Sequence, residues 1–230
     1  MVTKVDWEDI FTVLRRMRDR SETPEFQAGV QKIEAEAAEK LEIREGFERQ
    51  HYLSSSGIPR MCWDRLDAPG ESESMTAVRR FLDRPVRVSP DKTPCVFLTL
   101  AGPSGRRKTS AAGWACFQLR GMFLDARELV HAGQFDPIWD DIHRTQFLVI
   151  DELGAEHTND AAQSSLMSAL IKREGNLRKT IIITNLDAPG FKARYMSGPM
   201  QRLGERLEAS GEWVSLPGPS LRTHWSEATP

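Results

Sequence analysis

Residues 97–112 read FLTLAGPSGRRKTSAA. The stretch begins as an apolar run typical of a buried strand, continues through a turn that contains Gly and Pro, and ends in residues suited to a helix. A strand, such a loop and a helix in this order come close to a P-loop, in which backbone N–H groups and the helix N-terminus surround phosphate groups. We therefore expect nucleotide phosphates to bind at Gly102, Pro103, Ser104, Gly105, Arg106, Arg107, Lys108, Thr109 and Ser110.

Two side chains of this loop carry its chemistry, and a third departs from the pattern. Lys108 is placed to neutralise phosphate charge and Thr109 to hold Mg²⁺. Arg107 stands where the motif has Gly. If the backbone there needs a positive φ, a side chain costs about 1–2 kcal/mol, whereas micromolar affinity corresponds to about 8 kcal/mol. The sequence therefore predicts weakened nucleotide binding. The alternative is a loop that keeps its shape but has lost its ligand.

A second motif lies downstream, where residues 147–152 read FLVIDE. It is an apolar strand that ends in two acids, and α/β sheets place their sites at the carboxyl ends of strands. We expect Asp151 to hold Mg²⁺ through water and Glu152 to orient and deprotonate the attacking water. Alternatively, the two acids begin a helix and stabilise its N-terminus. The presence of Lys108 and Thr109 favours the catalytic interpretation.

A third apolar run, residues 180–184, is followed by Asn185, whose amide could reach a γ-phosphate or the water beside it. An ordinary turn residue is the alternative. Short apolar runs alternate with helical segments after Pro94, which predicts a parallel sheet flanked by helices and joined by right-handed crossovers. The strands are expected at residues 96–100, 123–125, 147–150, 180–184 and 213–216.

Composition is that of an ordinary globular chain. Its 230 residues are 40% hydrophobic and 28% charged, enough for one α/β core and a small appendage. The net charge of −2 creates no overall attraction to nucleic acid, although clustered Arg and Lys residues could touch phosphate or could simply be solvated. Three scattered cysteines support neither disulfides nor zinc, so we expect a reducing cytoplasm. No apolar run is long enough to span a membrane, and the N-terminus does not resemble a signal peptide.

Three regions follow from the pattern along the chain. Residues 1–51 are expected to form a helical, partner-binding module, with an amphipathic helix near 5–18 and a second from Thr23 and Pro24 to about residue 48. Residues 52–94 contain many Ser, Pro and Gly and are expected to form a connecting segment with a short helix at 75–82. Residues 95–230 would form the core, with a compact C-terminal end.

With these motifs in order, the stretch from about Tyr52 to Arg222 resembles the DnaC/IstB-like family of AAA+ ATPases, which comprises replicative helicase loaders and transposition helper proteins. The resemblance rests on the three motifs and on SGIP at 56–59, IDELG at 150–154, TNL at 184–186, RL at 202–203 with ERL at 205–207, and GPSLR at 218–222. It implies an AAA+ P-loop NTPase core that binds ATP and Mg²⁺ and is shared between subunits of a homo-oligomer. In it, Asn185 would be sensor 1, Arg206 an arginine finger offered in trans and Arg222 sensor 2 in cis. Spacing alone, without the resemblance, favours surface residues of a terminal helix and strand for both arginines.

We expect the first of two functions and keep the second as its alternative. In the first, a helicase loader, the N-terminal helices bind a DnaB-like replicative helicase and the assembled cores contact single-stranded DNA. In the second, a transposition helper or scaffold binds nucleotide with little turnover and recruits a transposase. Arg107 favours the second function, whereas the intact Glu152 argues against it. A small-molecule kinase is a more distant alternative, because no lid-like run of arginines follows the core.

Overall fold

A computed structural model describes residues 12–13, 16, 23–86, 94–155, 160–196 and 200–219. The chain divides into two compact units, Met1–Tyr52 and Leu53–Pro230, and each is considered by itself. Most of the helix expected near residues 5–18 lies outside the described residues, and so does Arg222.

The first unit is described mainly by α2, a 32-residue helix, Pro24–Ser55. It begins where Thr23 and Pro24 predicted, because proline has a suitable φ for the first helical position and lacks only an N–H that would be unpaired there. It continues past residue 48 to Ser55, and Gly57 follows with a φ of +78°, a left-handed conformation that an α-helix cannot contain. Several apolar side chains of α2 are exposed, including Phe47 at 73% and Ile43 at 66%. No helix among the described segments could cross a membrane.

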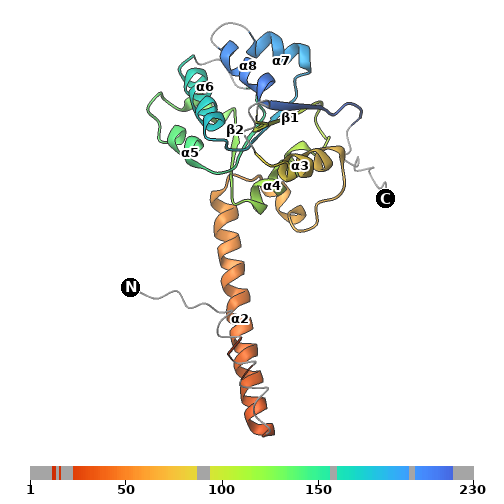
Figure 1. The fold of residues 1–230 in the computed structure, drawn as a ribbon, viewed down its shortest axis with the longest axis vertical. Coiled ribbons are helices and arrows are strands. Elements are labelled where there is room, and N and C mark those ends of the chain that lie inside the picture. Colours follow the sequence, from red (N-terminus) through yellow and green to blue (C-terminus); the bar gives the residue numbers. More distant parts are fainter. Residues whose placement is uncertain are drawn as a thin grey trace, which may run out of the picture. The chain divides into compact units, whose positions relative to one another are not determined.

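The second unit is built on a parallel sheet of five strands in the order β2-β3-β4-β1-β5 (Figure 1). Strands β1, β3 and β4 are short, mainly apolar runs that are buried along their whole length, as expected for strands covered on both faces. The edge strands β2 and β5 are less completely buried. The parallel sheet expected from the sequence is confirmed. Its strands are β1 (Phe97–Ala101), β2 (Met122–Asp125), β3 (Leu148–Asp151), β4 (Thr180–Thr184) and β5 (Gly211–Ser215).

Helices cover both faces of this sheet. The connection through α4 runs from β1 out to the edge strand β2, whereas the later connections return across the sheet in the opposite direction, and right-handed crossovers then place the two sets on opposite faces. Figure 1 shows α3 and α4 together, apart from α5 to α8. The helices are α3 (Glu73–Asp83), α4 (Lys108–Gln118), α5 (Ile138–Arg144), α6 (Asp160–Gly175), α7 (Ala188–Tyr195) and α8 (Gln201–Ala209), with 3₁₀ helices η1 (Arg60–Arg65) and η2 (Glu128–His131).

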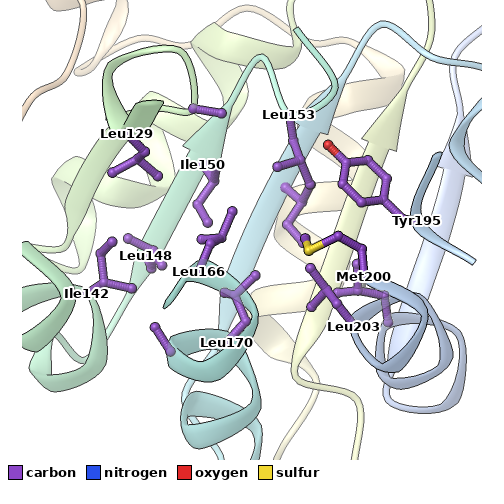
Figure 2. Close-up of a cluster of buried hydrophobic side chains, with 14 of the residues drawn as sticks. Leu129, Ile142, Leu148, Ile150, Leu153, Leu166, Leu170, Tyr195, Met200 and Leu203 are labelled. Carbon is purple, nitrogen blue, oxygen red and sulfur yellow. The ribbon is translucent and has the colours of Figure 1, made fainter. Parts of the chain in front are cut away.

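The main core lies between the sheet and α5 to α8. Figure 2 shows Leu148 and Ile150 of β3 beside Leu166 and Leu170 of α6, all of them buried. Arg173 of α6 is also fully buried, and it donates hydrogen bonds to the carbonyl oxygens that close α5 and precede β4. Burial lowers the pKa of Arg173 to about 9. A buried, fully hydrogen-bonded guanidinium therefore fastens α6 to its neighbours.

The stretch expected to be a connecting segment packs into the second unit. It contains η1 and α3, and apolar side chains such as Leu66 and Phe81 are fully buried there. The Oγ of Ser72 accepts a hydrogen bond from the Met75 N–H and caps α3. Lys179, which precedes β4, donates to three carbonyl oxygens at the other end of α3. Turn residues dominate this stretch in sequence, but its few apolar residues decide how it packs.

Candidate functional site

The carboxyl ends of three neighbouring strands bring the candidate residues together. Strand β4 lies between β1 and β3, and all three run in the same direction. The loop that follows β1, Asn185 after β4 and the acids at the end of β3 therefore meet at one edge of the sheet. Right after this loop, α4 begins at Lys108, so the N–H groups of its first turn have no partner within the helix and can face an anion.

The backbone of the loop adopts conformations that favour glycine. Gly102 has a φ of +142°, and a Cβ there would lie 2.5 Å from the carbonyl oxygen of Leu216. Gly105 has a φ of +86°, and Arg107 has a φ of +60° and a ψ of 20°. Arg107, a non-glycine residue, therefore occupies the left-handed region. This is the positive φ on which the expected weakening of nucleotide binding depends. Its guanidinium lies beside Gly70, on the turn before α3.

Arg107→Gly is expected to tighten ATP binding by about 5- to 30-fold, because relief of a left-handed side chain is worth about 1–2 kcal/mol. Calorimetric titration with ATP measures the change. The matched control is Arg107→Ala, which removes the same guanidinium but keeps a Cβ at positive φ. If the Ala and Gly variants bind ATP equally well, backbone strain is not what weakens the loop.

The side chains at this edge form one connected network. The buried Lys108 ammonium donates to the carbonyl oxygens of Gly102 at 2.5 Å and Pro103 at 2.9 Å, and to Asn185 Oδ1 at 3.0 Å. Asn185 in turn donates from Nδ2 to Glu152 Oε2 at 2.9 Å. Burial lowers the pKa of Lys108. Asn185 thus links the candidate phosphate-binding cation to the candidate general base, a contact between residues far apart in the sequence.

The candidate metal ligands are adjacent. Thr109 Oγ1 donates to Asp151 Oδ2 at 2.8 Å, and Asp151 Oδ1 accepts from the Glu152 N–H at 2.8 Å. Burial raises the pKa of the Asp151 carboxyl. Glu152 has a φ of +57°, a strained conformation of the kind found at functional sites.

These donors fit Mg²⁺. The ion prefers oxygen ligands, keeps several waters and is usually held by one or two carboxylates together with substrate phosphates. A hydroxyl paired with a carboxylate beside a phosphate-binding loop meets that description. Within the described ranges, no group of three or more His, Cys, Asp or Glu side chains could form a dedicated metal cage.

Arg206 is not brought to this edge in its own subunit. It lies on α8 with its Nη1 3.6 Å from Glu174 Oε2, and Glu174 accepts a hydrogen bond from Ser210, the residue before β5. This places Arg206 at the amino ends of the strands, and a five-residue strand separates the two ends by about 16 Å. The Arg206 side chain is 57% exposed, so it is accessible to another molecule.

Two polar residues near the site were missed in the sequence. Asp125 ends β2 directly beside Asp151 of β3, and Arg127 donates to both of its carboxylate oxygens. These hydrogen bonds lower the pKa of Asp125 although burial opposes them. The available signal was an apolar run that ends in an acid, the same signal that identified Asp151.

Comparisons with known proteins address the fold. No protein-family model matches the chain, and no curated protein matches it in sequence. The crystal structure of the DnaC helicase loader matches with a TM-score of 0.52 and 21% identity over 69% of this chain and 100% of that one. DnaI matches with a TM-score of 0.51 and 19% identity over 72% of this chain and 95% of that one.

A replication initiator DnaA bound to AMPPCP and single-stranded DNA matches with a TM-score of 0.53 and 12% identity over 71% of this chain, which spans about half (52%) of that structure. At such identities these matches concern the fold. The expectation of an α/β fold with a parallel sheet flanked by helices is confirmed by these structures and by the strand order. The second unit of the chain therefore has the AAA+ P-loop NTPase fold, like that of the DnaC helicase loader.

Proposed function

We propose that this chain is an ATP-binding AAA+ protein that hydrolyses ATP slowly and acts in DNA replication as a helicase loader. The observation that supports the ATPase activity most directly is the meeting of Lys108, Thr109, Asp151, Glu152 and Asn185 at one edge of the sheet. Each has the chemistry that phosphoryl transfer to water requires, and the fold is one in which this edge carries the site.

Each residue has a distinct task in this proposal. Lys108 and the N-terminus of α4 bind the phosphates of ATP, and Thr109 and Asp151 hold Mg²⁺, which when bound neutralises phosphate charge. Glu152 accepts a proton from the attacking water, because its carboxylate lies beside Asp151 and is oriented by Asn185. Asn185 lies between Lys108 and Glu152 and can sense the phosphate that Lys108 binds.

Slow turnover and a shared site follow from two further features. Arg107 strains the loop, and Arg206 lies at the opposite edge of the sheet from its own loop. An exposed arginine can reach the site of a neighbouring subunit, where its planar guanidinium can donate two hydrogen bonds to phosphate oxygens. We therefore propose that hydrolysis requires a homo-oligomer in which Arg206 completes the neighbour's site and Arg222 acts within its own subunit.

Mixing Arg206→Ala chains with Lys108→Ala chains is expected to recover part of the ATPase activity that each lacks alone. One variant supplies an intact pocket and the other an intact arginine. Steady-state phosphate release from assembled mixtures measures the recovery. The control mixes Arg206→Ala chains with the Lys108→Ala, Arg206→Ala double variant, which supplies no arginine and should recover nothing. Equal rates in the two mixtures would rule out the shared site.

The role in helicase loading is supported by the DnaC-like fold and by the first unit. Phe47 and Ile43 lie one turn apart on α2 and are largely exposed, a pattern suited to docking a helix into an apolar groove. We propose that this unit binds a DnaB-like replicative helicase. Contact of the assembled cores with single-stranded DNA is part of the same proposal, and a DnaA of similar fold is bound to such DNA.

A chain that begins at Leu53 is expected to keep ATP binding and to lose capture of its cognate helicase, because Leu53–Pro230 is a compact unit by itself. Capture from the native cell with tagged chains, followed by identification of the bound proteins, measures this. The full-length Ile43→Ser, Phe47→Ser double variant should lose capture too, whereas Glu45→Gln on the same helix should not. Helicase capture that survives the truncation would contradict the docking role.

A transposition helper or nucleotide-binding scaffold is the second candidate, and Arg107 favours it because a strained loop suits binding without fast turnover. In the same capture experiment, recovery of a transposase in place of a helicase would establish this alternative.

A further inference from the structure

The side chain of Arg106 leaves the phosphate-binding loop and joins two other segments. Its Nη2 donates to Glu73 Oε2 at 2.8 Å, at the first residue of α3, and its Nη1 donates to the carbonyl oxygen of Pro219 at 3.1 Å. The side chain is only 10% exposed although it is charged. The P-loop pattern asks for no particular side chain at this position.

Further hydrogen bonds and a close contact join the same segments. The buried Ser74 hydroxyl donates to the Arg106 carbonyl oxygen at 2.7 Å. The Leu216 N–H donates to the Ala101 carbonyl oxygen at 2.7 Å, and a Cβ on Gly102 would collide with Leu216. The start of α3, the phosphate-binding loop and residues 216–219 after β5 therefore meet at one place.

We propose that Arg106 is a positioning residue. Its side chain fastens residues 216–219, hereafter the C-terminal strap, to the phosphate-binding loop, so that the conformation of the loop depends on that of the strap. The strap leads directly into Arg222, the candidate sensor 2. This inference rests on the proposed ATPase function, because the coupling matters only where the loop binds phosphates. It assigns to the Arg106 side chain a contact with the strap, whereas the sequence predicted contact of this residue with phosphates.

Arginine suits this task for a physical reason. Its planar fork presents five donors in fixed directions, so one guanidinium can bind a carboxylate and a carbonyl oxygen at once. A lysine ammonium is a compact point charge on a flexible stem and would hold the two partners less rigidly. In addition, Arg106 Nε is buried with no hydrogen-bond partner in the part of the chain that the structure describes. An orphaned donor costs stability, which argues against selection for stability alone.

Hydrogen exchange of the full chain without nucleotide tests the fastening. In Arg106→Met, exchange at the Leu216 and Gly218 amides, the two N–H groups of the strap, should rise by about tenfold, because the hydrogen bond that anchors the strap is lost. Arg106→Lys should give an intermediate rise. Glu73→Ala, which leaves the loop residue in place, should give a smaller rise in the same direction. The control is Arg144→Met, which removes an arginine that is 75% exposed and should leave the strap unchanged. Unchanged exchange in Arg106→Met and Glu73→Ala would overturn the proposal.

Kinetics test the coupling. Arg106→Met should raise the KM for ATP by about tenfold with a smaller effect on kcat, and Arg106→Lys should restore part of the loss. If Arg106 acts through the strap, the Arg106→Met, Arg222→Ala double variant should be no worse than the worse single variant. Additive losses would overturn the coupling.

The two proposals fail in different ways. A strap that loosens while the KM is unchanged overturns the coupling and leaves the ATPase function standing. A wild-type chain that binds no ATP overturns the ATPase function and the coupling together, and the exchange experiment still decides whether Arg106 fastens the strap.

Discussion

Lys108→Ala is expected to abolish measurable ATP binding, with affinity falling at least about 100-fold. Lys108 is 5% exposed, and its ammonium is hydrogen-bonded to two loop carbonyl oxygens and to Asn185, so its removal leaves both the phosphates and the loop without their cation. Hydrogen bonds to a charged group are worth about 1.5–3 kcal/mol each, and a tenfold loss corresponds to 1.4 kcal/mol. Calorimetry with ATP, ADP and a non-hydrolysable analogue measures the effect.

The control for this change is Lys192→Ala, because Lys192 is 60% exposed on α7 and pairs with Glu208 away from the loop. Thermal unfolding of both variants checks that the loop has not simply collapsed. If the Lys108→Ala variant binds ATP as the wild type does, the loop is not the nucleotide site. If the wild type gives no heat with any of the three ligands, nucleotide binding itself is refuted.

Glu152→Gln is expected to keep ATP binding and to lower turnover by about 10²–10⁴-fold, the range that general-base catalysis contributes. Glutamine has nearly the same shape and can still accept the hydrogen bond from Asn185 Nδ2 through its carbonyl oxygen, so the network should survive. An amide cannot take a proton from water at neutral pH. Single-turnover hydrolysis, measured beside ATP affinity, separates the two effects.

Glu128→Gln is the matched control, since Glu128 is an exposed acid on η2 outside the hydrogen-bond network of the site. It should leave both affinity and turnover unchanged. Hydrolysis by Glu152→Gln at a rate near that of the wild type would remove Glu152 from the role of base and would favour a site that uses another residue.

Local patterns predicted much of the fold. All five strands were expected within a residue or two of their observed positions. The central strands β1, β3 and β4 were the plainest, because strands buried on both faces must be largely apolar along their length. The turn between β1 and α4 was equally recognisable, since its glycines and its Lys and Thr all lie within residues 102–109. The end of α2 was placed too early because Ser and Tyr near residues 52–55 resemble loop composition, whereas the chain leaves the helical conformation only after Ser55, before the left-handed Gly57.

The sequence by itself determined which side chains are available for phosphate and metal chemistry, because Lys108, Thr109, Asp151 and Glu152 lie in contiguous motifs. Only the tertiary structure decided how they meet. The position of β4 between β1 and β3 is what joins Lys108 to Asn185 and Asn185 to Glu152.

The tertiary structure likewise decided that Arg106 holds the C-terminal strap, 113 residues away, and that Arg206 lies at the far edge of the sheet. The physical reason is that strand order and side-chain packing depend on contacts between residues distant in the chain. The hydrophobic pattern of a segment indicates which of its side chains are buried, but it does not indicate which other segments pack against them.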